Sequence, residues 1–320
     1  MKALPVLAFI ARRLLALVAL LFVVSFLVFS LVYLAPGSPV DVLLGDQPRT
    51  PETIALLEAK YHLDQPFLVQ FWYWLQGAVQ LDFGESIRTT LPVADEIFAR
   101  LPVTVFLAVY AFILELVIGL TVGVLAAYRQ RSMLDRGLVS LTVVGLSTPA
   151  FVSGVFVLFI FSVALEWFPA FGAGDGFLDR LWHLTLPALA LAIVGAAFIV
   201  KNTRAAVIAV LDQDFVTFAR ARGMSHAHVL LRYVIRNALI PILGISAMLL
   251  AHLLVGAVFV EVTFSIAGIG DLIVKAANSQ DLPMIQGVTL FVAIIVMLFN
   301  LLADLAYIAV DPRVQKRVLA

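Results

Sequence analysis

Long apolar runs recur along the chain, separated by segments in which charged and polar residues gather. A helix needs about 20 mostly apolar residues to cross the hydrocarbon core of a bilayer. Uncharged runs of this length lie at residues 14–40, 137–165, 181–200, 237–260 and 282–303. A further run, residues 101–128, is interrupted only by Glu115. The pattern predicts an all-α polytopic membrane protein with six transmembrane helices.

The first run follows Arg12 and Arg13, as the apolar core of a secretory signal follows its basic residues. A signal core has roughly 7 to 15 residues, and this run is much longer. We therefore expect it to be retained as a span.

The composition agrees with lipid as the main solvent. The chain is 62% hydrophobic and 13% charged, with a mean hydropathy of +1.06. A soluble domain is about half apolar and about a quarter charged. The chain has no cysteine, which excludes disulfides, thiolate metal sites and cysteine nucleophiles.

Basic residues gather on one side of the predicted helices. Six spans place the N-terminus, residues 129–136, residues 201–236 and the tail together, and this side holds 15 of the 21 Lys and Arg residues. The positive-inside rule makes it cytoplasmic. The opposite side carries 15 of the 21 acidic residues and all four Trp, which prefer the headgroup level. We expect a multi-pass protein of the plasma (inner) membrane with both termini in the cytoplasm.

Residues 35–100 form an outer segment that is too long for a simple turn. Thr50 followed by Pro51 predicts the start of a helix. The apolar face of that helix is formed at helical spacing by Ile54, Leu57 and Tyr61. The aromatic stretch 67–75 predicts an interfacial helix. Two roles remain open for this segment: a platform for an external partner, or a cap over the helix bundle.

The predicted organisation has four parts. They are residues 1–34 with the first helix, the outer segment 35–100, a five-helix core 101–310 and a cytoplasmic tail 311–320. The core includes the only long cytoplasmic loop, residues 201–241.

No residue pattern indicates catalysis or a cofactor. None of the five Lys residues follows a glycine, so the phosphate-binding P-loop is absent. His226 and His228 point to different helix faces, and no carboxylate cluster supports a metal site beside them. We expect this chain to have no enzyme activity, metal or cofactor of its own and no nucleic-acid partner.

The 201–241 loop is ordered rather than linker-like. Asp212 and Asp214 occupy the N-cap and first-turn positions of a short predicted helix. One face of that helix is formed at i, i+3, i+4, i+7 spacing by Phe215, Phe218, Ala219 and Arg222. Gly223 suits the position that ends it.

Ser225 is suited to cap a second helix of the loop. Its apolar stripe consists of Val229, Leu230, Tyr233 and Val234. The opposite face carries His228, Arg232 and Arg236 at i, i+4, i+8 spacing. A basic anchor on anionic lipid explains the arginines. A glycine break and a knob tipped by Phe218 and Ala219 favour a groove on another protein.

The stretch Asp214-Phe-Val-Thr-Phe-Ala-Arg-Ala-Arg-Gly-Met-Ser225, continued by Arg236-Asn-Ala-Leu-Ile-Pro241, resembles the EAA coupling loop of ABC importer permeases. Within that family the chain is most similar to B-type permeases of the dipeptide, oligopeptide and nickel class. Further matching stretches are Pro51-Glu-Thr-Ile, Leu63-Asp-Gln-Pro66, Asp82-Phe-Gly-Glu-Ser86, Gly145-Leu-Ser-Thr-Pro-Ala-Phe151, Phe264-Ser-Ile-Ala-Gly-Ile-Gly270, Gln286-Gly-Val and Asp311-Pro-Arg313. Thr217 and Phe218 replace the Glu and first Ala of the wider family motif, and Ala267 replaces a usual proline.

The resemblance implies the type I ABC importer permease fold and four partners: a second homologous permease subunit, two cytoplasmic ATPases that bind ATP and Mg²⁺, and an external binding protein. The implied coupling residues are Asp214, Phe215, Thr217, Phe218, Ala219, Arg220, Ala221, Arg222, Gly223 and Ser225. The implied substrates are di- or oligopeptides. Nickel chelates, glutathione or another small solute are alternatives, as are a proton-driven secondary carrier and a membrane scaffold that transports nothing.

Ionisable residues inside spans are costly and mark sites of function or structure. Glu115 and His252, at the middle of the second and fifth spans, are expected to face the translocation path or to form a buried polar pair. Asp304, near the cytoplasmic end of the sixth span, is expected to form structural hydrogen bonds. Pro149 is expected to kink the third span.

Overall fold

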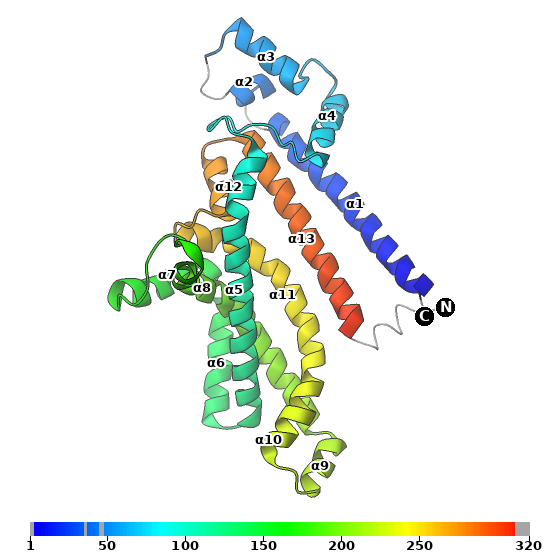
Figure 1. Cartoon of the computed structure of the whole chain (residues 1–320), viewed down its shortest axis with the longest axis vertical. Helices are drawn as coiled ribbons and strands as arrows, with labels where there is room; N and C mark the ends of the chain where they lie inside the picture. Colours follow the sequence, from blue (N-terminus) through cyan, green and yellow to red (C-terminus); the bar gives the residue numbers. More distant parts are fainter. Residues whose placement is uncertain (1–2, 35–36, 45–47, 311–320) are drawn as a thin grey trace. The chain divides into compact units, whose positions relative to one another are not determined.

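The structure, a computed structural model, describes residues 3–34, 37–44 and 48–310 (Figure 1). Regular structure in these residues is helical apart from an isolated antiparallel bridge between Glu85 and Pro92. The α-helices are α1 (Ala3–Leu34), α2 (Pro39–Leu44), α3 (Pro51–Tyr61), α4 (Phe67–Val79), α5 (Val93–Tyr128), α6 (Met133–Ser147), α7 (Ala150–Leu158), α8 (Gly176–Leu211), α9 (Asp214–Ala221), α10 (His226–Val229), α11 (Arg236–Thr263), α12 (Ile269–Asn278) and α13 (Leu282–Val310). Two π-helical segments are η1 (Phe159–Ala164) and η2 (Leu230–Ile235). The predicted all-α fold is confirmed.

In the described residues, each of the six predicted spans consists largely of helix. Among the described residues, α1, α5, α8 and α13 are long and apolar enough to cross a membrane, and α6 with α7 and η1 forms a bent fifth candidate. The predicted fifth span lies within α11, where the side chains of several residues fall outside the described part. The count of six therefore stays a prediction.

The described chain divides into two compact units. The first unit comprises Ala3–Thr104 and Ala267–Leu298, and the second unit comprises Val105–Ile266 and the end of α13 from Phe299. The outer segment belongs to the same unit as α1, α12 and most of α13. The predicted division into four parts stays a prediction. The predicted tail, residues 311–320, lies outside the described residues.

The hydrophobic core of the first unit accounts for this grouping. Phe83, Val93 and Ile97 pack with buried residues of α12 and α13. Gly287 permits the close approach of α13, because a β-carbon there would overlap the side chains of Val93 and Phe83. Burial of apolar surface therefore joins the end of the outer segment to helices far along the chain.

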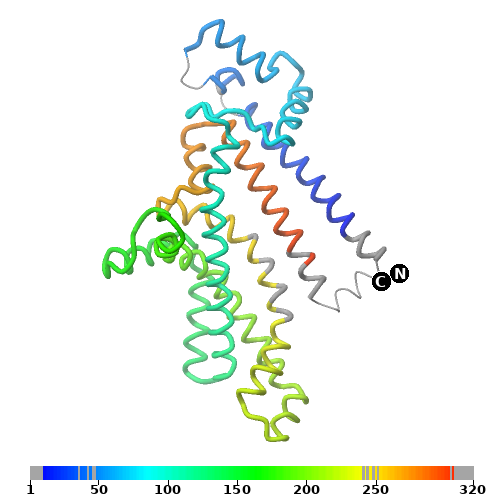
Figure 2. Tube along the Cα trace, in the orientation of Figure 1, coloured from blue at the N-terminus to red at the C-terminus, as the bar shows by residue number. Residues whose placement is uncertain are grey.

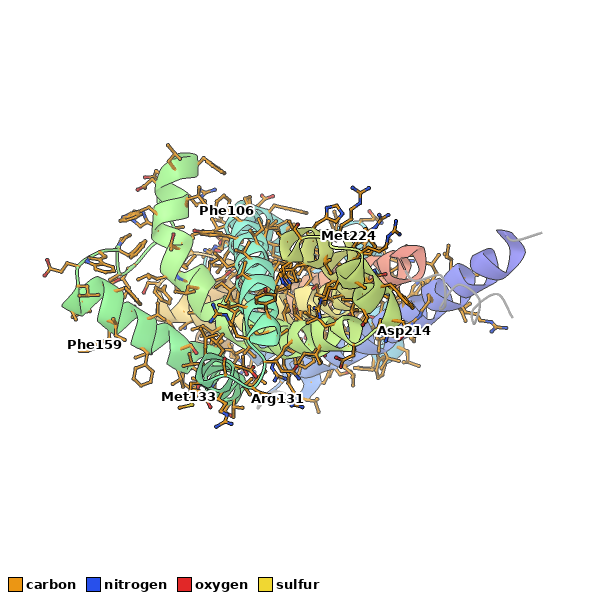
Figure 3. All side chains as sticks on the ribbon, turned by 90° about the horizontal axis from the view of Figure 1, so that it is seen from below. Phe106, Arg131, Met133, Phe159, Asp214 and Met224 are labelled. Atoms are coloured by element: carbon orange, nitrogen blue, oxygen red, sulfur yellow. The ribbon has the colours of Figure 1, made fainter. Side chains whose placement is uncertain are left out.

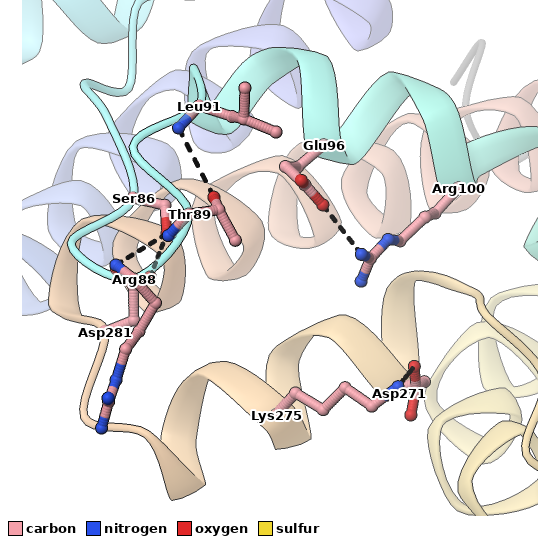
Figure 4. Close-up of polar contacts among 9 residues, drawn as sticks. All are labelled: Ser86, Arg88, Thr89, Leu91, Glu96, Arg100, Asp271, Lys275 and Asp281. Carbon is pink, nitrogen blue, oxygen red and sulfur yellow. Dashed lines mark hydrogen bonds and ion pairs between the residues drawn. The ribbon is translucent and has the colours of Figure 1, made fainter.

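A buried carboxylate reinforces the same junction (Figure 4). Ser86 Oγ donates a hydrogen bond to Asp281, and the backbone N–H of Ile87 donates to its Oδ1 at 3.3 Å. Arg88 Nε donates to the backbone oxygen of Ser279 at 3.4 Å. Asp281 is 3% exposed, so Ser86 and Ile87 supply the hydrogen-bond donors that a buried acid requires.

The outer segment begins its second helix where predicted. Thr50 is the N-cap of α3, with its Oγ1 accepting from the backbone N–H of Thr53 at 3.2 Å. Thr53 Oγ1 accepts from the backbone N–H of Thr50 at 3.0 Å, which completes a capping box. Pro51 stands at the first helical position, and His62 ends α3 in the left-handed region at φ 53°. The predicted aromatic helix is α4, which extends to Val79.

In the second unit, α5 and α8 approach closely along matching positions. Glu115, Gly119 and Gly123 of α5 lie against Gly195, Ile199 and Thr203 of α8, each at i, i+4, i+8 spacing. A β-carbon on Gly195 would overlap the Glu115 carboxylate, and one on Gly119 would overlap Ile199. Small residues opposite large ones allow the two backbones to pack tightly.

The third predicted span breaks at Pro149. Thr148 is extended at φ −99° and ψ 118°, and α7 begins directly after Pro149. The helices α6 and α7, the latter continued by η1, bend by 111° across this break. Proline lacks an N–H donor and disfavours helical geometry in the residue before it, which explains why the chain leaves the helix here.

Candidate functional site

The 201–241 segment is only partly a loop. Its first eleven residues continue α8 to Leu211 (Figure 2). The short helices α9 and α10 follow after this long helix ends. No glycine or proline interrupts residues 201–211, and Thr203 and Val207 are fully buried. The helix therefore continues because one of its faces still packs against the rest of the second unit.

The first short helix, α9, starts at Asp214 with Gln213 as its N-cap, so Asp214 is the first-turn acid and Asp212 caps the end of α8 instead. The buried face of α9 is formed by Val216 and Ala219, which are 0% and 5% exposed. The predicted shared face of Phe215, Phe218, Ala219 and Arg222 is thus divided, since only Ala219 is buried.

Phe218 lies on the side of α9 that faces away from the hydrophobic core. It is 69% exposed, and its neighbour Phe215 is 40% exposed. Asp214 and Met224, labelled in Figure 3, mark the ends of the segment that carries both rings. The other predicted coupling residues are also exposed: Asp214, Thr217, Arg220, Ala221, Arg222, Gly223 and Ser225.

The turn after α9 has fixed geometry. Gly223 adopts φ +76°, a left-handed conformation that other residues adopt only with strain. Its N–H donates to the backbone oxygen of Arg220 at 2.9 Å, and the N–H of Met224 donates to that of Ala219 at 3.3 Å. This pair of bonds is a Schellman motif, so Gly223 ends α9 as the sequence predicts.

The second helix continues directly into α11. Ser225 is the N-cap of α10, with Oγ accepting from the backbone N–H of His228 at 3.4 Å. Val229 and Val234 of the predicted apolar stripe are 2% and 0% exposed. The basic face remains outside, at His228, Arg232 and Arg236. The π-helical η2 joins α10 to α11 without a break.

One hydrophobic cluster connects these short helices to the long ones. Val216 and Ala219 of α9 share it with Val229 of α10 and with buried residues of α5 and α8, including Ala127 and Val207. The short helices α9 and α10 therefore share one packed core with α5 and α8.

An ion pair that the sequence reasoning missed supports the same region. Arg204 Nε and Nη2 donate to the two oxygens of Asp135 at 2.7 and 2.9 Å. Asp135 also accepts from the backbone N–H of Arg131, which lies beside Met133 at the turn into α6 (Figure 3). The only signal in the sequence was a single acid among the arginines of residues 129–136.

The remaining predicted residues lie in different environments. Glu115 is 2% exposed and wedged against Gly195, and its Oε2 has no hydrogen-bond partner among the described residues. His252 is exposed, and no hydrogen bond or ion pair joins it to Glu115 in the described part of the chain. Asp304 lies in α13, but its side chain is outside the described part. The residues that the structure describes contain no group of three or more acids and histidines arranged for a metal.

The arrangement defines a class of protein. Several described helices are long and apolar enough to cross a membrane, and the short helix α9 is buried on one face and exposes Phe218 on the other. These features indicate a polytopic membrane protein.

Two family models of membrane transport components match this chain. Residues 119–316 match the family model described as the binding-protein-dependent transport system inner membrane component, and residues 6–108 match the N-terminal model of such membrane components. The chain belongs to this family of ABC importer permeases.

Curated relatives extend over nearly the whole chain. It is 37% identical over 311 residues to a putative peptide transport system permease protein of Brucella abortus (strain 2308), covering 96% of this chain and 99% of the relative. It is 36% identical over 307 residues to the glutathione transport system permease protein GsiC of Escherichia coli (strain K12), covering 96% and 98%.

A solved structure shares the fold. The inward-facing MetNI methionine ABC transporter matches with a TM-score of 0.52 at 16% identity, over 69% of this chain and 95% of that chain. The chain is therefore a multi-pass inner-membrane permease subunit of an ABC importer and not itself an enzyme. Permeases of this family work with an ATPase and a substrate-binding protein.

Proposed function

We propose that this chain forms half of a translocation path for short peptides. A second homologous permease forms the other half, and an external binding protein delivers the substrate. The name of the Brucella relative supports peptides as the substrate class. Both termini lie in the cytoplasm, a placement supported by the 15 of 21 basic residues on that side.

The α9–α10 segment couples the permease to two ATPase subunits, which bind ATP and Mg²⁺. The single observation that carries this proposal is the exposure of Phe218 on a helix whose opposite face is fixed in the core. An exposed large aromatic ring on a rigid support is suited to fill a pocket on another protein.

Substitution of Phe218 tests the proposal. In vesicles that contain the full complex and the binding protein, Phe218→Asp is expected to reduce ATP-driven dipeptide uptake by at least about tenfold, because a charge replaces the anchoring ring. Phe218→Leu is the matched control, and it is expected to keep most uptake because it retains an apolar tip. Normal uptake by Phe218→Asp would refute the coupling role.

Glutathione is a second candidate substrate. GsiC matches this chain at nearly the same identity and coverage as the peptide relative. Competition of glutathione with labelled dipeptides during uptake distinguishes the two substrates. Strong inhibition of dipeptide uptake by glutathione supports glutathione as a substrate, and no inhibition supports ordinary peptides.

A further inference from the structure

A cavity of about 390 Å³ lies within the first unit. Its wall is formed by residues of α1, α2, α3, α4 and α13 and by the segment that follows α4. Sites for small molecules have volumes of about 300 to 1,000 Å³ and combine apolar walls with a few convergent polar groups. The coupling function described above makes no use of this cavity.

Three charged side chains line the cavity: Lys60, Asp82 and Glu85. Lys60 Nζ and Glu85 Oε2 form an ion pair at 2.7 Å, and their side chains remain 46% and 53% exposed. Glu85 raises the pKa of Lys60, which keeps the amine protonated. Asp82 lines the same cavity, and its Oδ1 accepts a hydrogen bond from the backbone N–H of Gly84 at 3.0 Å.

These three side chains carry one more negative charge than positive charge. Among the described residues, no ion pair joins Asp82 to a basic side chain. A ligand that supplies an ammonium group would restore the balance, and a carboxylate on the same ligand can approach Lys60. Charge-assisted hydrogen bonds of this kind give both affinity and orientation.

Aromatic residues also line the cavity: Phe29, Tyr33, Tyr61, Tyr73 and Trp74. The Tyr61 ring lies beside the charged groups, with its centroid 5.8 Å from Lys60 Nζ. Tyr73 stacks on the His62 ring with a centroid distance of 4.2 Å. Tyr33 donates its hydroxyl hydrogen bond to Gln70, whose amide in turn donates to the backbone oxygen of Gln65 at 2.7 Å. The Tyr33 hydroxyl and the Gln70 amide are therefore bonded to each other and to the backbone, and the ring faces of the aromatic residues supply apolar surface for a side chain.

We propose that this cavity binds the amino-terminal end of a short peptide, with the ammonium group at Asp82 and Glu85 and the first apolar side chain against the aromatic residues. This inference rests on the proposed function, because it takes its ligand from the same substrate class. The cavity is a receiving site in the outer segment, separate from the α9–α10 segment.

Binding of phenylalanyl-alanine to the purified full complex in nanodiscs, without the external binding protein, tests the inference. Titration calorimetry is expected to show saturable binding. N-acetylated phenylalanyl-alanine is expected to bind at least about tenfold more weakly, because it lacks the ammonium group. Asp82→Asn with Glu85→Gln is expected to cause a similar loss, since both changes keep the side-chain shapes. Glu58→Gln, at an exposed position of α3 outside the cavity wall, is the matched control and should bind normally.

Three results would overturn the inference: no saturable binding to the wild-type complex, equal binding of the acetylated peptide, or unchanged binding by the double variant. Binding of the external binding protein that depends on Asp82 and Glu85, with no binding of the dipeptide, would also overturn it and would assign the cavity to that protein. Dipeptide uptake is measured separately. Failure of ATP-driven uptake by the wild-type complex contradicts the proposed function, whereas normal uptake without binding in the cavity contradicts only this inference.

Discussion

The pairs α3–α4 and α9–α10 are built alike, and they place their aromatic residues differently. Each consists of two short helices joined at a residue in the left-handed region, His62 in the first pair and Gly223 in the second. In α3–α4, Phe71 is 4% exposed, and the centroid of its ring lies 5.6 Å from the ring centroid of Phe29 in α1. In α9–α10 the buried positions are small or β-branched, and Phe218 is 69% exposed.

The difference separates rings that stabilise the fold from rings that are available to a partner. Burial of an aromatic ring contributes directly to folding, whereas an exposed ring contributes little until another surface covers it. Substitution of the buried ring of Phe71 in α4 should therefore change stability, and substitutions on the outer side of α9 should change coupling. Three variants test this contrast.

The largest effect is expected for Phe71→Asp. Loss of a buried ring costs about 3 to 5 kcal/mol, and a buried charge without a partner adds to this cost. We expect the detergent-purified variant to unfold at a clearly lower temperature, and protease to cleave the outer segment more readily. Phe218→Asp, which places the same charge on an exposed position, is the matched control and should unfold like the wild type. Equal loss of stability in Phe71→Asp and Phe218→Asp would contradict the claim that only the buried ring stabilises the fold.

A smaller effect is expected for Gly223→Val. A β-branched residue at φ +76° costs about 1 to 3 kcal/mol locally, which should loosen the joint between α9 and α10. The complex is expected to hydrolyse ATP with reduced uptake of substrate per ATP consumed, measured in proteoliposomes. Gly137→Val, at a glycine in α6 with open space around its β-position, serves as the control. Unchanged coupling in Gly223→Val would show that the joint need not be rigid.

The smallest effect is expected for Thr50→Ala. Loss of the α3 capping box costs about 1 kcal/mol. The expected outcome is faster amide hydrogen exchange in the first turn of α3 with uptake little changed. Thr50→Ser retains the hydroxyl and should behave like the wild type. Protection that stays unchanged in Thr50→Ala would mean that the cap contributes nothing to α3.

Local chemistry made much of this fold predictable. Thr50 with Pro51, and Gly223 with Ser225, each identify a helix boundary through their own hydrogen-bonding and backbone preferences, and the structure places those boundaries where they were expected. The long apolar runs likewise identified helices, because lipid leaves no other way to satisfy the backbone.

Features that depend on distant partners were not predictable. The pair Asp135–Arg204 joins positions 69 residues apart, and no local pattern relates them. The continuation of α8 beyond residue 201 depends on burial of Thr203 and Val207 in the packed unit. For α9, helical spacing alone favoured Phe218 for the same face as Ala219, whereas packing buried Val216 instead.

The most direct test of the coupling account uses the absence of native cysteine in this chain. Phe218→Cys introduces a single thiol, and a short thiol-to-amine cross-linker can then be added to the complex in membranes. If α9 contacts an ATPase subunit, Phe218→Cys is expected to form a covalent product with that subunit, and Val216→Cys is expected to form none, because that position is buried. A Phe218→Cys variant that supports uptake but forms no product with the ATPase would contradict the account.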